Sequence, residues 1–232
     1  MQFSDLPPEM QNADTKEWFQ RLEKKRGQLF AKRVFDVAAA AVIAGVTSPI
    51  MLLLAAAIKL DSPGPVFYRQ VRVGRWGKPF RIFKFRTMVQ DADKKGLALT
   101  VGEDARITRM GHLLRKCRLD EFAQVFNVLN GTMSLVGPRP EVPKYVEQYD
   151  PSYLPTLLVR PGVTAPSSLH FRNEDEILAA SPDDPEKTYV EKVLPIKMKL
   201  NLDYLEDISV VTDLKVLWQT LRMFLSNGKN GA

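Results

Sequence analysis

Cysteine and histidine are scarce in this chain. Its 232 residues include one cysteine, Cys117, and two histidines, His112 and His170. A single cysteine permits no internal disulfide, and two histidines without companion ligands do not make a zinc site. The composition therefore excludes a disulfide-stapled secreted domain, and we expect the soluble part to face the reducing cytoplasm.

One long stretch lacks charge. Val37 to Ile58 reads VAAAAVIAGVTSPIMLLLAAAI, whereas 26% of the whole chain is charged. At about 1.5 Å per helical residue, this run reaches roughly across a 30 Å hydrocarbon core. It starts too far into the chain and is too long for a cleavable signal peptide. We expect a polar segment with an amphipathic helix over 1–33, a membrane helix over 34–60 and a cytoplasmic catalytic domain over 61–232.

Ser48 and Pro49 lie in the middle of the run, where proline removes a backbone donor, so the helix should kink or break there. Both flanks are basic: Lys24, Lys25, Arg26, Lys32 and Arg33 precede the run, and Lys59, Arg69, Arg72, Arg75, Lys78 and Arg81 follow it. A single crossing normally concentrates Lys and Arg on one side. The flanks favour a re-entrant hairpin, but a spanning helix with a proline kink fits these residues about as well.

The net charge of +6 indicates anionic partners, which are acidic lipid headgroups, a phosphorylated substrate or nucleic acid. Asp14 and Glu17 suit the start of an amphipathic helix that either lies in the headgroup layer or packs on the protein. Extended stretches at 66–73 and 80–88, joined by GRWGK, predict a β-hairpin rich in basic and aromatic residues. Such a hairpin suits single-stranded nucleic acid, but next to a membrane helix we favour headgroup or phosphate contact.

Two helices are predicted around a pair of carboxylates. Helical spacing of apolar residues indicates one helix over 105–118 and a second that starts near Asp120. Asp120 and Glu121 thus fall at a helix start, where an N-cap and a first-turn acid need no catalytic role.

Three arginine-bearing motifs follow. They are GTMSLVGPRPE at 131–141, VRPGVT at 159–164 and FRN at 171–173. Pro138 and Pro140 hold the backbone of Arg139 extended, which presents its guanidinium from a stiff loop. Arg160 and Arg172 add two further guanidinium groups.

These motifs, together with SPGPVFYRQVRVG, FKFRTM and LRKCRLDE, resemble the bacterial sugar transferase family, which comprises monotopic polyprenyl-phosphate phosphoglycosyltransferases. The resemblance covers about Lys32 to Leu221. It implies transfer of a sugar 1-phosphate from a nucleotide sugar, usually a UDP-sugar, to undecaprenyl phosphate with release of UMP. It also implies a place at the cytoplasmic face of the bacterial inner membrane, in the first membrane step of surface glycan assembly, with membrane lipids as partners and no nucleic acid.

The resemblance further implies a role for particular residues. Asp120 is expected to be the nucleophile and, with Glu121, to hold Mg²⁺. The residues expected to bind substrate are Arg115, Pro138, Arg139, Pro140, Arg160 and Arg172. The family's re-entrant helix is bent at a Ser-Pro pair, which corresponds to Ser48 and Pro49. The expected fold is α+β and mostly helical, with a re-entrant helix-break-helix, interfacial amphipathic helices and a small β-hairpin around the catalytic core.

The chemistry is consistent without the family name, because a carboxylate that attacks a diphosphate needs a divalent cation and guanidinium groups to screen repulsion. Two alternatives lack turnover: a membrane-tethered module that binds anionic lipid or nucleic acid, and an inactive membrane scaffold. Asn201 stands where the family often has an acidic residue. No motif fixes the sugar, the oligomeric state or the role of residues 174–193.

Overall fold

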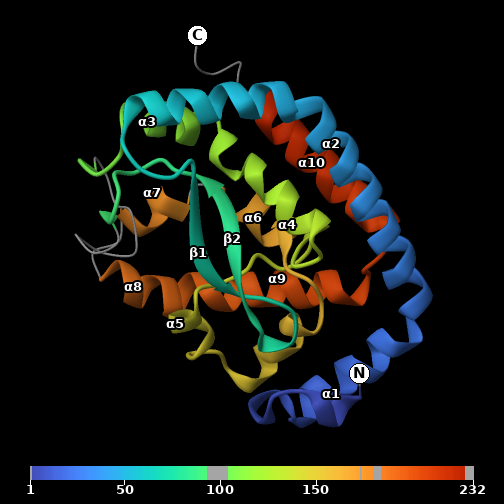
Figure 1. The fold of residues 1–232 in the computed structure, drawn as a ribbon. Coiled ribbons are helices and arrows are strands. Elements are labelled where there is room, and N and C mark those ends of the chain that lie inside the picture. The colour runs from blue at the N-terminus through green and yellow to red at the C-terminus, as the bar shows by residue number, and fades with distance from the viewer. Residues whose placement is uncertain (1, 93–103, 173, 180–183, 228–232) are drawn as a thin grey trace.

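The computed structural model describes residues 2–92, 104–172, 174–179 and 184–227. The described chain is mainly helical around two small sheets (Figure 1). The α-helices are α1 Ala13–Lys24, α2 Arg26–Asp61, α3 Arg109–Lys116, α4 Val125–Leu129, α5 Pro143–Val146, α6 Pro166–His170, α7 Glu174–Ala179, α8 Pro185–Thr188, α9 Leu194–Glu206 and α10 Val210–Asn227. The strands are β1 Phe67–Val73, β2 Pro79–Phe85, β3 Ser134–Val136 and β4 Gly162–Thr164. This confirms the mostly helical fold class.

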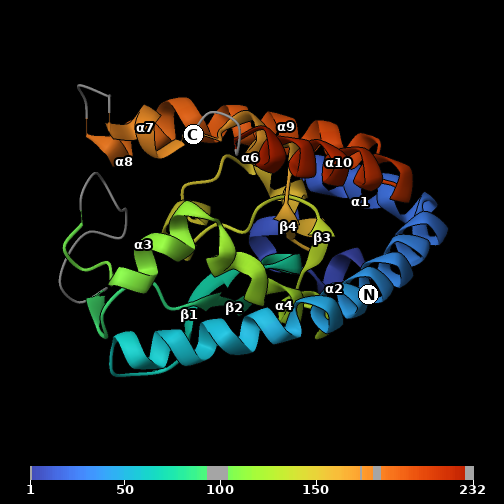
Figure 2. The same cartoon turned by 90° about the horizontal axis from the view of Figure 1, so that it is seen from above.

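The apolar run lies in the 36-residue helix α2, which bends and changes direction along its length (Figures 1 and 2). The expected break is wrong, because the helix continues through Pro49. Proline cannot donate to the carbonyl four residues earlier, that of Gly45. The Ser48 hydroxyl donates to this carbonyl at 2.8 Å and so replaces the missing bond. The Ser-Pro pair therefore bends α2 without interrupting it.

Helix α2 is the one helix in the described part of the chain that is long and apolar enough to cross a membrane. Only 11% of its most apolar window is buried, so it is not the core helix of a soluble domain. The exposed large side chains of α2 are Phe30, Val34, Val37, Val42, Ile43, Val46, Ile50, Leu52, Leu53 and Leu60. An apolar surface of this length, with nothing covering it, is typical of contact with lipid.

Both ends of α2 bind to the same body of the protein. Near the N-terminal end, the buried Lys32 ammonium donates to the Val136 carbonyl at 2.9 Å. At the C-terminal end, Arg86 Nη2 donates to the Ser62 carbonyl at 2.7 Å, and the Asp61 carboxylate accepts from the Met110 backbone N–H at 3.0 Å. The part of the chain that follows α2 therefore contacts the helix on either side of its apolar run.

The predicted hairpin is confirmed. β1 pairs with β2 antiparallel, with Phe67 opposite Phe85 and Val73 opposite Pro79. Several of its basic groups make contacts within the protein: Arg75 Nε donates to the Leu158 carbonyl, and Arg69 stacks 3.9 Å from the centre of the Phe83 ring. These two basic side chains therefore make contacts within the protein, and the expected contact of the hairpin with headgroups or phosphate stays a prediction.

The N-terminal segment is more ordered than its polar composition suggests. Leu6 and Met10 are buried in the main core, in two 3-10 turns ahead of α1. Asn12 is the N-cap of α1, since its side chain accepts from the Thr15 N–H at 2.8 Å, so the expected helix start at Asp14 is two residues late.

The second sheet fixes the loop that carries Arg139. β3 and β4 pair in parallel, and their following loops approach so closely that a Cβ added at Gly162 would lie 2.1 Å from the Gly137 nitrogen. Gly162 N–H also donates to the Pro138 carbonyl at 2.9 Å. Both glycines are required for this contact, which binds the GPRP and RPG motifs to each other.

Candidate active site

A cleft of about 560 Å³ lies between α2 and the part of the chain that follows it. Its lining includes apolar side chains from α2 and α10, among them Ile43 and Leu217. Glu121, Phe122 and Arg139 also line it, together with a group of further polar side chains. The cleft thus joins an apolar region at α2 to charged groups.

Asp120 and Glu121 lie in a 3-10 helix, Leu119–Gln124, that leads directly into α4. Arg118 is its N-cap and takes a left-handed conformation with φ 55°. The alternative in which Asp120 is a helix N-cap is therefore wrong. Neighbouring side chains of a 3-10 helix point in different directions, so Asp120 and Glu121 have different surroundings.

Glu121 is held by two cations. Its carboxylate accepts from Lys84 Nζ at 3.0 Å and from both terminal nitrogens of Arg139, with the Nη1 contact at 3.3 Å. Burial alone raises the pKa of Glu121, but Arg139 and Lys84 outweigh it and lower the pKa below its usual range. Glu121 is therefore a permanent anion that fixes the Arg139 guanidinium in the cleft.

Asp120 is different. Partial burial raises its pKa, and the adjacent Glu121 adds to this, while Lys84 and Arg115 oppose it. Among the described residues no ion pair and no hydrogen bond from another side chain is made to its carboxylate, and Asp120 is adjacent to Glu121 without itself lining the cleft. A half-buried carboxylate that lacks a partner is the more reactive member of the pair.

Only some of the other residues predicted to bind substrate line the cleft. Arg139, Pro140 and Arg172 line the cleft. Arg115 is near Asp120, where its Nε donates to the Thr87 hydroxyl at 3.1 Å. Arg160 instead donates from Nε to the Gly131 carbonyl at 2.8 Å, so it holds a loop and does not line the cleft.

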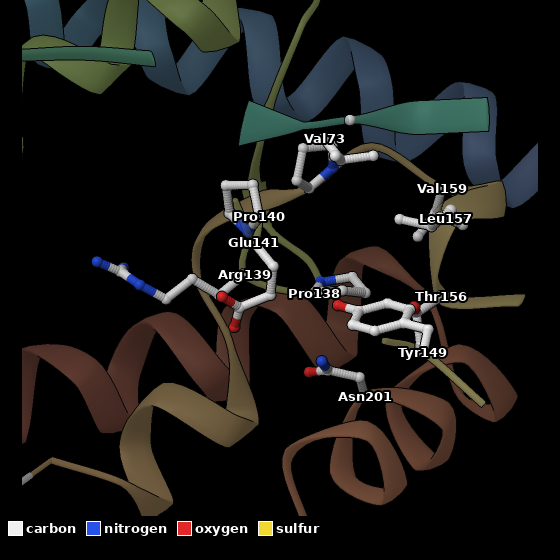
Figure 3. A pocket seen from close by; sticks show the side chains of 12 residues that line it. Val73, Pro138, Arg139, Pro140, Glu141, Tyr149, Thr156, Leu157, Val159 and Asn201 are labelled. Carbon is white, nitrogen blue, oxygen red and sulfur yellow. The ribbon is translucent and has the colours of Figure 1, made fainter. Parts of the chain in front are cut away.

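Pro138 and Asn201 border a separate cavity of about 10 Å³ (Figure 3). The Arg139 side chain extends away from Tyr149 and Asn201 in this view. Asn201 is buried and accepts from the Ser167 hydroxyl at 2.9 Å, which is a structural contact. The position that departs from the family pattern therefore lies in the core, apart from the cleft.

Lys84 is the site residue that sequence reasoning missed. It was visible only as one of many basic residues in the hairpin, and nothing local distinguishes it. Its contact with Glu121 joins residues 37 apart in the chain, and the packing of β2 against the 3-10 helix Leu119–Gln124 brings them together.

The described residues contain no group of three or more His, Cys, Asp or Glu side chains able to enclose a metal ion. The two adjacent carboxylates nevertheless suit Mg²⁺, which is commonly held by one or two carboxylates together with substrate phosphates. Asp120 has no bound cation of its own, and burial disfavours its charge, so a divalent ion would be stabilising there.

Glu121, which is paired with Arg139 and Lys84, and the adjacent Asp120 thus lie beside a cleft that reaches an exposed apolar helix. The family model described as bacterial sugar transferase matches residues 27–227, and the chain belongs to that family.

Three relatives show the extent of the similarity. The UDP-N-acetylgalactosamine-undecaprenyl-phosphate N-acetylgalactosaminephosphotransferase of Aeromonas hydrophila is 38% identical over 85% of this chain, which spans 44% of that protein. The UDP-glucose:undecaprenyl-phosphate glucose-1-phosphate transferase of Caulobacter vibrioides is 37% identical over 84% of this chain and 70% of its own length. Exopolysaccharide production protein PSS of Rhizobium leguminosarum is 35% identical over 87% of this chain and 98% of its own length.

Proposed function

We propose that the protein transfers a sugar 1-phosphate from a UDP-sugar to undecaprenyl phosphate and releases UMP. The observation that carries the proposal is the cleft, which brings the Glu121–Arg139 pair to the apolar surface of α2. A polyprenyl phosphate needs this combination, because its chain stays in lipid while its phosphate must reach charged groups. The relatives' names, which specify undecaprenyl phosphate, support the same acceptor.

In the first step, an Asp120 carboxylate oxygen attacks the phosphorus that bears the sugar. A new O–P bond forms, the bond to the bridging oxygen breaks, and UMP leaves with that oxygen and its electron pair. In the second step, an oxygen of the lipid phosphate attacks the same phosphorus and displaces the carboxylate. The product is a lipid diphosphosugar and the Asp120 carboxylate is regenerated. The Arg139 guanidinium, fixed by Glu121, stabilises charge on the phosphoryl oxygens.

Asp120 and Glu121 are the proposed Mg²⁺ ligands, with diphosphate oxygens completing the coordination. When bound, the ion would supply charge neutralisation and polarise the attacked phosphorus. Glu121 already contacts Lys84 and Arg139, so Asp120 is the better placed of the two carboxylates to bind it.

We also propose that α2 enters and leaves the cytoplasmic leaflet of the inner membrane. A straight helix of 36 residues would extend about 54 Å, and the catalytic body binds α2 on both sides of its apolar run. A spanning helix would place these contacts on opposite sides of the bilayer. The bend of α2, the proline inside it and the basic flanks support the re-entrant path.

Turnover tests the function. Purified protein in detergent, given UDP-sugars and undecaprenyl phosphate, is expected to release UMP from at least one sugar nucleotide. Release should require the lipid phosphate beyond a first turnover, stop with EDTA and return with Mg²⁺. Tight binding of anionic lipid or nucleic acid with no UMP release from any UDP-sugar would contradict the proposal and favour a binding module.

Cysteine labelling tests the topology. Single cysteines at Lys25 and Arg69, in a Cys117→Ser background, are expected to resist a membrane-impermeant thiol reagent added to spheroplasts. Both should react after the membrane is permeabilised, which controls for burial. Labelling of one position alone in intact spheroplasts would establish a spanning helix.

A further inference from the structure

The lining of the cleft includes a cluster of polar side chains that the proposed chemistry does not use. Its members are Gln70, Arg72, Glu141, Tyr145, Tyr189 and Lys197, and all six line the cleft. The Tyr189 hydroxyl donates to Glu141 Oε1 at 2.5 Å, and Lys197 Nζ donates to the Tyr189 oxygen at 3.2 Å. These contacts make a fixed polar wall.

The wall is close to electrically neutral. Lys197 forms a 2.7 Å ion pair with Glu174, and the second oxygen of Glu141 lies 4.0 Å from Arg72 Nη1. The positive charges of Arg72 and Lys197 therefore balance the negative charges of Glu141 and Glu174. A neutral wall with both donors and acceptors suits a neutral group that carries hydroxyls, and suits a phosphate poorly.

Three buried polar atoms in this region have no hydrogen-bond partner among the described residues: the Tyr145 hydroxyl, the Ser168 hydroxyl and Arg72 Nε. All three side chains line the cleft. Buried polar groups are nearly always satisfied, so this concentration at one cleft indicates a missing ligand. Burial raises the pKa of Tyr145 to about 12, so its hydroxyl stays protonated and able to donate.

The cluster lies next to the reacting groups. Arg139 and Glu141 are separated by one residue on the same loop, and they bind Glu121 and Tyr189 respectively. Burial lowers the pKa of Arg72, and the charges of both Glu141 and Glu121 oppose this effect, which places Arg72 within electrostatic reach of the dyad. In a nucleotide sugar, the sugar is joined through its anomeric oxygen to the phosphorus under attack.

Given the proposed function, we propose that this polar cluster binds the sugar ring of the nucleotide sugar and selects among sugars by their hydroxyl or acetamido pattern. Glu141 accepts from ring hydroxyls, and the Tyr145 and Ser168 hydroxyls contact further polar groups of the sugar. A site built to hydrogen-bond a hydroxyl discriminates strongly against a sugar that lacks it in that position.

The test compares two variants, Tyr145→Phe and Ser168→Ala, with the control Tyr153→Phe, whose tyrosine lies outside the cleft. UMP release is measured with UDP-glucose, UDP-galactose and their 2-acetamido counterparts, and UDP affinity is measured by calorimetry. At least one cleft variant should lower kcat/KM for the preferred sugar about tenfold and reduce its advantage over the next sugar, with UDP affinity unchanged within twofold. The control should match wild type, and thermal unfolding should confirm that all variants fold.

The possible failures are distinguishable. No release from any UDP-sugar by wild type would refute the proposed function. Normal wild-type turnover with sugar preference unchanged in both cleft variants would refute the sugar site alone. An equal loss of affinity for UDP and for the UDP-sugar would show that the wall binds the nucleoside, and would also overturn the proposal.

Discussion

Replacing Asp120 with asparagine is expected to lower turnover by about 10³-fold or more, the scale seen when a nucleophile is removed from an enzyme. Asparagine keeps the size of the side chain but has no anionic oxygen to attack phosphorus. Because burial raises the pKa of Asp120, its charge destabilises the folded state at neutral pH. The variant should therefore be as stable as wild type or more so. Loss of activity together with a raised Tm is the combination expected of a strained functional group.

A matched control is Asp203→Asn, on an exposed position of α9, which should retain wild-type turnover. Incubation of wild type with labelled UDP-sugar and no lipid should give one sugar-phosphate adduct on the peptide that contains Asp120, and none in the Asp120→Asn variant. Rapid-quench mass spectrometry without an adduct, combined with kinetics that require both substrates at once, would instead establish direct attack by the lipid phosphate.

The pH dependence of turnover follows from the same carboxylate. Asp120 must be ionised to attack, and its pKa is raised, so activity should fall on acidification at a higher pH than an ordinary aspartate would give. The pKa of Glu121 is shifted in the opposite direction. Arg139 and Lys84 lower it despite burial, so Glu121 stays ionised across this pH range. The acid limb of the profile therefore reports Asp120.

Much of the fold could be predicted from the sequence because its signals are local. The uncharged run predicted α2, two extended stretches joined by GRWGK predicted the β1–β2 hairpin, and apolar spacing predicted α3. The loop that presents Arg139 was also visible, since Pro138 and Pro140 restrict its backbone. The sequence predicted a kink or a break at Ser48 and Pro49 but could not decide between them, because the outcome depends on the Ser48 hydroxyl, which bonds to the carbonyl left without a donor by the proline.

The candidate site was predictable only in part. Asp120, Glu121 and Arg139 were identified by motif, but no local pattern indicates that Glu121 binds two cations while Asp120 makes no ion pair. The polar wall was missed altogether, because Tyr189 and Lys197 reach Glu141 from helices about fifty residues away. Such partners are fixed by packing, which no local pattern encodes.

The membrane helix and the Arg139 loop are joined by a buried polar network. Asp36 accepts from the Ser134 hydroxyl at 2.7 Å and from the Leu135 N–H at 3.1 Å, and Tyr204 donates to Asp213 at 2.6 Å. Asp36 and Asp213 are 1% and 0% exposed, so neither charge is solvated by water. Their cation is Lys32, which donates to Asp213 and to the Val136 carbonyl directly before the loop.

Removing that cation is expected to cost much of the stability of the fold. Lys32→Met fills a similar volume but leaves two buried carboxylates without compensation, and breaking a buried ion pair in this way costs about 3–5 kcal/mol. Urea unfolding in detergent should show this loss relative to wild type, whereas Lys24→Met, at an exposed position of α1, should change stability by less than about 0.5 kcal/mol. Turnover of the folded fraction should also fall, because Val136 and the loop after it lose their contact with α2. A loss no larger than that of Lys24→Met would mean that the network does not hold the membrane helix against the catalytic body.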